Sequence, residues 1–134
     1  MTPTFSGLSV EDQLNLQAIA ATVRRNFDGA RENYSKLLES STENKKHFAH
    51  FDLARTLESS DETALAIQHY NEAFQREPQF AAAAVRMGVL YGRQQDAAKS
   101  AEFFGKAEQI YNSRSDYDGV AEVSYQQGYF LGMQ

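Results

Sequence analysis

AIQHYNEAFQREP, residues 66–78, is the stretch of the sequence that decides the fold. Ala66, Tyr70 and Ala73 are spaced four and three residues apart, so on a helix they share one face. Two of these three residues are small, which allows another helix to approach that face closely. Pro78 cannot extend a helix and biases the residue before it away from helical geometry. The stretch therefore predicts one half of a tightly packed helical hairpin.

The composition is that of an ordinary folded domain. The chain has 134 residues, of which 42% are hydrophobic, enough for one domain that buries roughly two-thirds of its unfolded surface. A net charge of -5 argues against a general nucleic-acid binder, which would carry a basic face. The sequence has no cysteine, so disulfides and thiolate zinc sites are excluded. It shows neither a signal peptide nor an apolar run of the ~20 residues that a membrane span needs, so the cytoplasm is the default expectation.

The small and aromatic pattern recurs along the chain at nearly constant spacing. In AAKSAEFFGKAEQIYN the corresponding positions follow 34 residues later and are Ser100, Phe104 and Ala107. A weaker copy precedes the opening stretch by 36 residues, with Ala30, Tyr34 and Leu37 at these positions. Upstream of the two strong copies, an offset of 34 also relates Leu53, Ala54 and Leu57 to Met87, Gly88 and Tyr91. Such a period is the sequence signature of a stacked helical repeat.

The pattern Met87-Gly88-x-x-Tyr91 … Ser100-x-x-x-Phe104-x-x-Ala107, with Pro78 closing the preceding unit, resembles the tetratricopeptide repeat (TPR). The resemblance covers about residues 9–134. It implies an all-α, right-handed superhelix (an α-solenoid) of antiparallel helix pairs, with about three and a half repeats. The chain departs from the family in lacking its early tryptophan, which His50 and Ala84 replace.

Seven helices are expected, at about 9–25, 28–40, 45–58, 62–77, 80–93, 97–112 and 117–132. Four residues can accept hydrogen bonds from a first helical turn: Ser9, Ser60, Asp96 and Ser115. We expect one TPR-like domain over 1–134, with repeats at about 9–44, 47–80, 81–114 and 117–134. The last repeat lacks its second helix, so we expect the chain to be a segment of a longer array.

No pattern in the sequence points to catalysis, a cofactor or a metal ion. The chain has no nucleophile elbow, phosphate-binding loop or zinc-ligand spacing. His47 and His50 lie three residues apart, but a metal site needs more ligands, and His69 is expected to face outward from the next helix. We therefore expect a protein that is not an enzyme, with no catalytic, cofactor-binding or metal-binding residue.

The resemblance places a binding groove on the first helix of each pair. Carried over residue by residue, it implies a partner-binding surface made of Phe48, Phe51, Arg55, Arg86, Val89, Arg93, Tyr125 and Tyr129. Aromatic residues and arginines are frequent at binding hot spots. For Phe48 and Val89, packing between helices is an equally good interpretation. The family's clamp for a carboxylate tail is not expected, because Asp52 occupies one of its positions and would repel a carboxylate.

The sequence thus predicts a non-catalytic TPR module that binds a peptide or a partner helix, without nucleic acid and without membrane insertion. Two alternatives remain open. Tyr125 and Tyr129 belong to a strongly apolar last helix, which predicts a sticky C-terminal face and a homo-oligomer formed through it. In addition, SDYDGVAEVSYQQGYFLG resembles repeat regions appended to bacterial serine/threonine kinases and membrane-linked regulators, so the chain could be a regulatory region of a larger signalling protein.

Overall fold

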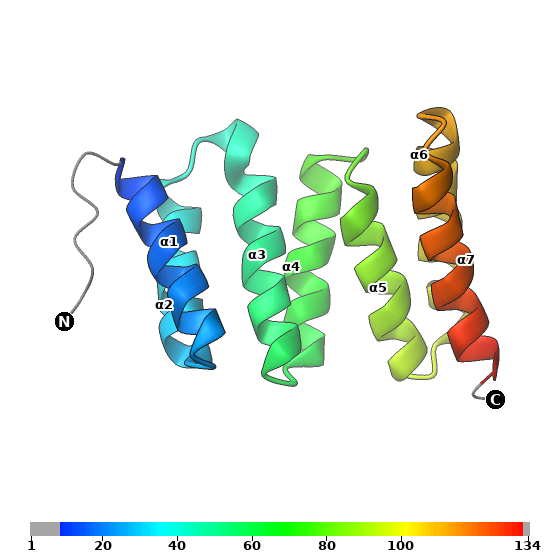
Figure 1. Cartoon of the computed structure of the whole chain (residues 1–134), viewed down its shortest axis with the longest axis horizontal. Coiled ribbons are helices and arrows are strands. Elements are labelled where there is room, and N and C mark those ends of the chain that lie inside the picture. Colours follow the sequence, from blue (N-terminus) through cyan, green and yellow to red (C-terminus); the bar gives the residue numbers. More distant parts are fainter. Residues whose placement is uncertain (1–8, 133–134) are drawn as a thin grey trace. The chain divides into compact units, whose positions relative to one another are not determined.

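The computed structural model describes residues 9–132, with side chains up to residue 128, and this part of the chain is entirely helical (Figure 1). Its elements are α1 (Val10–Val23), α2 (Phe27–Ser40), the short 3-10 helix η1 (Glu43–Lys45), α3 (Lys46–Ser59), α4 (Thr63–Arg76), α5 (Ala81–Arg93), α6 (Ala97–Ser113) and α7 (Tyr117–Gly132). Each predicted helix is present, with both ends within two residues of the expected position. The prediction of an all-helical fold is confirmed. None of the described helices combines the length and the apolar character needed to cross a bilayer.

The chain forms two compact units, which we describe separately. Unit 1 ends at His69 and unit 2 begins at Tyr70, both within α4. In unit 1, α1 packs on α2 and α2 packs on α3. In unit 2, α5 packs on α6 and α6 packs on α7. The division into repeats at 9–44, 47–80, 81–114 and 117–134 stays a prediction.

Four turns share one backbone geometry. The second residue of each three-residue turn has a left-handed φ: 59° at Arg25, 62° at Asp61, 62° at Gln95 and 53° at Ser115. The first three of these residues are separated by 36 and 34 positions, the same offsets that relate the copies in the sequence. The repeat is therefore visible in the backbone as well as in the side chains. Left-handed φ values are uncommon outside glycine, so the turns are held by their neighbours.

Two of the four predicted helix starts are confirmed. The Ser9 hydroxyl accepts a hydrogen bond from the Asp12 amide at 3.1 Å at the start of α1. The Asp96 carboxylate accepts one from the Lys99 amide at 3.1 Å at the start of α6. These contacts satisfy amides that have no partner within the helix.

The other two predicted starts are wrong. Ser115 has a left-handed backbone, which does not suit a capping residue, and Asp116 takes the role by accepting from the Gly119 amide at 2.9 Å. Ser60 ends α3 instead of starting α4, since its hydroxyl donates to the Leu57 carbonyl at 3.1 Å. For α7, the sequence pattern finds the capped turn but misplaces the cap by one residue.

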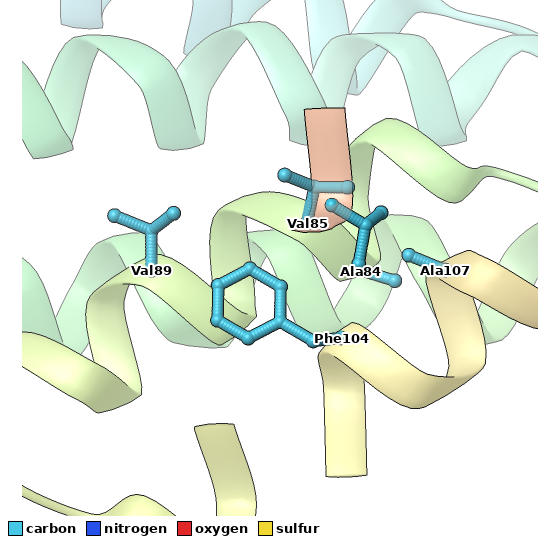
Figure 2. Packing of buried hydrophobic residues seen from close by; sticks show 6 residues of the cluster. Ala84, Val85, Val89, Phe104 and Ala107 are labelled. Carbon is cyan, nitrogen blue, oxygen red and sulfur yellow. The ribbon is translucent and has the colours of Figure 1, made fainter. Parts of the chain in front are cut away.

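The core of unit 2 lies between α5, α6 and α7. Phe104 is 1% exposed and packs with a cluster of small and branched residues, namely Ala84, Val85, Val89, Ala107 and Val123 (Figure 2). The close approach of α6 to α5 depends on Gly88, because a Cβ there would come within 2.9 Å of the Phe104 ring. The Ser100 hydroxyl donates to the Gly88 carbonyl at 2.8 Å and fixes the same contact.

The other repeat positions are buried as the sequence predicts, except Tyr91, which is partly buried. On α4, Ala66, Tyr70 and Ala73 are each 0% exposed. In unit 1 the core consists mainly of small and aliphatic side chains from three helices: Ala18, Ala30, Leu37, Leu53, Ala54 and Leu57. The Tyr34 side chain, which is also buried, lines the pocket described next.

Candidate functional site

A pocket of about 230 Å³ opens among the three helices α1, α2 and α3 of unit 1. Its lining residues are Ile19, Thr22 and Val23 from α1, Tyr34 from α2, and Asp52, Arg55, Thr56 and Ser59 from α3. Helical spacing brings them together, because the lining residues of each helix are one, three or four positions apart and share a face. The pocket combines an apolar edge on α1 with a charged edge on α3.

The hydroxyl groups of the pocket use their protons within their own helices. Thr22 donates to the Ala18 carbonyl at 2.9 Å. Thr56 donates to the Asp52 carbonyl at 3.2 Å, and Ser59 donates to the Arg55 carbonyl at 3.0 Å. A hydroxyl has a single proton but two lone pairs, so Thr22 and Ser59 offer acceptor oxygens to anything in the pocket, whereas Thr56 is only 2% exposed.

Burial shifts the titration of two groups in the pocket. Burial raises the pKa of Asp52 above its ordinary value of 3.8, and the nearby Arg55 charge lowers this pKa by a smaller amount. Burial also raises the pKa of the Tyr34 phenol, with a further increase from the Asp52 charge, while Arg55 and a hydrogen bond with Thr22 oppose the shift. Perturbed carboxyl groups in a cleft are frequent at functional sites.

The three predicted binding residues of unit 1 all lie on α3. Phe48 is exposed over 57% of its surface. Arg55 is exposed and lies at the pocket, with its guanidinium carbon 6.0 Å from the centre of the Phe51 ring. An arginine at this distance from an aromatic face is attracted to it. The structure therefore brings Phe51 and Arg55 together beside the pocket.

The predicted residues of unit 2 have mixed positions. Arg86 is half-buried on α5, Arg93 is exposed at the end of that helix, and Tyr125 on α7 is exposed over 67% of its surface. Val89 is only 3% exposed and belongs to the core around Phe104. This burial favours the packing interpretation of Val89, and its role in partner binding stays a prediction. The Tyr129 side chain lies outside the described residues.

The histidines of unit 1 differ from expectation. His69 does not simply face outward: its Nδ1 lies 3.0 Å from Nδ1 of His50, and the two rings stack with centres 5.2 Å apart. His50 is only 7% exposed. Over residues 9–132, no three histidine or carboxylate side chains come together as metal ligands.

Comparison with known proteins supplies a family. A model described as "Uncharacterized protein conserved in bacteria (DUF2225)" matches residues 19–126. The chain belongs to the DUF2225 family. The matched region of this DUF2225 chain contains every residue that lines the pocket. No curated protein is significantly similar to the sequence.

Solved structures similar to this DUF2225 chain show what fold it has. The TPR2B domain of yeast Sti1, solved as a pHsp70 complex, is 14% identical with a TM-score of 0.83, covering 93% of this chain and 98% of that one. PcrH in complex with the chaperone binding region of PopB is 14% identical with a TM-score of 0.79, covering 90% and 98%. The Sgt2 TPR domain from Aspergillus fumigatus is 17% identical with a TM-score of 0.71, covering 96% and 85%. At these identities the likeness establishes a TPR-like fold.

Proposed function

We propose that this DUF2225 chain is a non-catalytic protein-interaction module that binds an extended peptide or a partner helix along α1 and α3 of unit 1. The observation that carries the proposal is the pocket among α1, α2 and α3, whose lining combines hydrogen-bonding side chains with the exposed apolar side chains of Ile19 and Val23. Two of the solved structures with the same fold, those of Sti1 and PcrH, were determined with a bound partner, which agrees with this use of the fold.

The surroundings of the pocket suit a peptide better than a small metabolite. On α1, Ile19 is 45% exposed and Val23 is 79% exposed, and both line the pocket. On α3, Phe48 lies one turn before Asp52 on the same face, since the two are four residues apart. Apolar and aromatic side chains that flank a pocket can hold alternate side chains of an extended chain while the pocket fixes its register.

Arg86, Arg93 and Tyr125 supply a second surface of similar chemistry in unit 2. All three keep contact with solvent, and α5 presents Arg86 and Arg93 seven residues apart on one face. We assign these residues to partner binding as well. Their contribution can be tested separately from that of the pocket, because the two sets of residues lie in different units.

A binding experiment with a matched control tests the proposal. Pools of degenerate octapeptides are titrated into ¹⁵N-labelled protein, and shifts of the amide resonances of α1 and α3 report binding. Ile19→Ser should weaken the pool that binds best, since it removes apolar surface at the pocket. Leu65→Ser is the control, because Leu65 is 44% exposed and lies outside the pocket lining. Equal effects of the two changes, or no shift with any pool, would contradict the proposal.

Self-association through α7 is the second candidate. Tyr117 is 75% exposed and Tyr125 is 67% exposed on this helix. Light scattering of the purified chain over a range of concentrations tests it. A concentration-dependent dimer that Tyr125→Ser abolishes would support association through α7, and a monomer at every concentration would reject it.

A further inference from the structure

Most of the polar side chains that line the pocket of unit 1 can accept hydrogen bonds, and Arg55 is the one lining residue that brings several donors. The hydroxyl protons of Thr22, Thr56 and Ser59 are already bonded to carbonyls of their own helices. The Tyr34 hydroxyl is engaged with Thr22. The solvent-accessible hydroxyls of Thr22 and Ser59 therefore present oxygen lone pairs to a ligand, which favours a group that donates hydrogen bonds.

The Asp52 carboxylate adds a negative charge to this set of acceptors. It is half-buried in the lining of the pocket, and its side chain makes no hydrogen bond or ion pair with any other described residue. A carboxylate withdrawn from water normally has a cation or several donors as partners, because desolvating a charge is costly. Asp52 has neither within the part of the chain that the structure describes.

Arg55 does not fill this role. It forms no ion pair with Asp52 in the structure, and its guanidinium group lies against the Phe51 ring. Arg55 is also exposed, so water screens its charge, whereas Asp52 is half-buried. Its effect on Asp52 is smaller than that of burial. The carboxylate therefore has room for a second, external cation.

We infer that the pocket binds the cationic end of a lysine or arginine side chain of the partner peptide, with Asp52 as its counter-ion. This inference rests on the proposed function and specifies the chemistry of the partner. The aliphatic part of the side chain lies against Ile19 and Val23, as the stems of long basic side chains do on apolar surfaces. A cavity of about 230 Å³ holds such a group, since one water occupies about 30 Å³. The net charge of -5 also favours a basic partner.

The inference is tested with peptide pools that differ at one position. Five degenerate octapeptide pools carry lysine, arginine, glutamine, norleucine or glutamate at the fifth position and only uncharged residues elsewhere. Each pool is titrated into the ¹⁵N-labelled chain, and the shifts of residues around Asp52 give the affinity. The lysine or arginine pool should bind at least about tenfold more tightly than the norleucine pool, as expected for a charge-assisted hydrogen bond.

Two variants change the net charge of the chain by the same amount. Comparing them distinguishes a direct effect of Asp52 on the bound cation from an effect of the net charge. Asp52→Asn keeps the shape of the side chain and should reduce the affinity for the basic pool to that for the norleucine pool. Asp28→Asn is the matched control, because Asp28 is exposed on α2 and does not line the pocket. It should leave the preference for the basic pool unchanged.

The outcomes distinguish this inference from the proposed function. If the norleucine or glutamate pool binds at the pocket as well as the basic pools, peptide binding stands and the preference for a cation is wrong. The preference is also wrong if Asp28→Asn reduces it as much as Asp52→Asn does. If no pool shifts the resonances of α1 and α3, both the inference and the proposed function are rejected.

Discussion

The ring of Phe104 lies against the backbone of Gly88, so close that a Cβ at Gly88 would come within 2.9 Å of its Cδ1 atom. Phe104 is 1% exposed and cannot move outward to make space. Gly105, the next residue of α6, has no atom within 4 Å of the position where its Cβ would lie. Two helical glycines of the same unit thus differ in the space around them: a Cβ would be crowded at Gly88 and would meet open space at Gly105.

The first prediction compares alanine at these two glycines. Gly88→Ala should lower the free energy of unfolding by up to about 2 kcal/mol, because overpacking costs about 1–3 kcal/mol and exceeds the gain in helix propensity. Gly105→Ala should raise it by about 0.5–1 kcal/mol, because only the propensity changes. Urea unfolding followed by circular dichroism measures both. A stabilised Gly88→Ala variant would show that the contact with Phe104 is looser than the structure has it.

The second prediction concerns the ring itself. Phe104→Ala should cost about 3–5 kcal/mol, the usual range when truncation of a buried aromatic residue leaves a cavity. The partly buried Phe74 and Tyr111 at the edge of the same cluster should cost less when truncated to alanine. Chemical denaturation of the three variants ranks them. A Phe104→Ala cost below about 1 kcal/mol would place that ring at the surface.

The third prediction locates the start of α7. Asp116→Ala should destabilise the chain by about 0.5–2 kcal/mol, because it removes the acceptor of the Gly119 amide. Ser115→Ala should change stability by less than about 0.5 kcal/mol, since Ser115 is exposed and does not cap the helix. Thermal unfolding of both variants measures these changes in stability. If Ser115→Ala lost more stability than Asp116→Ala, Ser115 would be the capping residue of α7, as the sequence predicts.

The fourth prediction uses the raised pKa of Asp52. A carboxyl group whose pKa is raised by folding binds more protons in the folded state, so ionisation opposes folding as the pH rises. Asp52→Asn removes this cost and should therefore have a higher melting temperature than the wild type at pH 7. The difference should shrink as the pH falls through the raised pKa and should vanish below 3.8, where the wild-type carboxyl is protonated in both states. A difference that does not change with pH would contradict the effect of burial on Asp52.

The helices were predictable because their pattern is local. Ala66, Tyr70 and Ala73 mark a buried face within one helix, and the same spacing recurs at Ser100, Phe104 and Ala107, all of which are buried. The caps were less predictable, since a serine next to an aspartate offers two candidates within one turn. Only the backbone shows that Ser115 has a left-handed φ and that Asp116 is the residue that accepts.

The pocket was harder to predict from the sequence than the helices were. Arg55 was expected at a binding surface, but Tyr34 and Asp52 belong to different helices, and no motif links a phenol to a carboxylate 18 positions later. Asp52 entered the sequence argument only as a residue that would repel a carboxylate. Its burial is a property of three packed helices and does not follow from the order of the residues.

The contact between His50 and His69 has a consequence for the number of protons that this pair can hold. Their Nδ1 atoms lie 3.0 Å apart, so a hydrogen bond there requires one proton between two nitrogens. In the neutral pair one ring is the Nδ1–H tautomer and the other is the Nε2–H tautomer. One added proton leaves a bond from an imidazolium to an imidazole intact. A second added proton puts hydrogen on both Nδ1 atoms, and at least one ring must then rotate away from the other, which breaks this contact between α3 and α4.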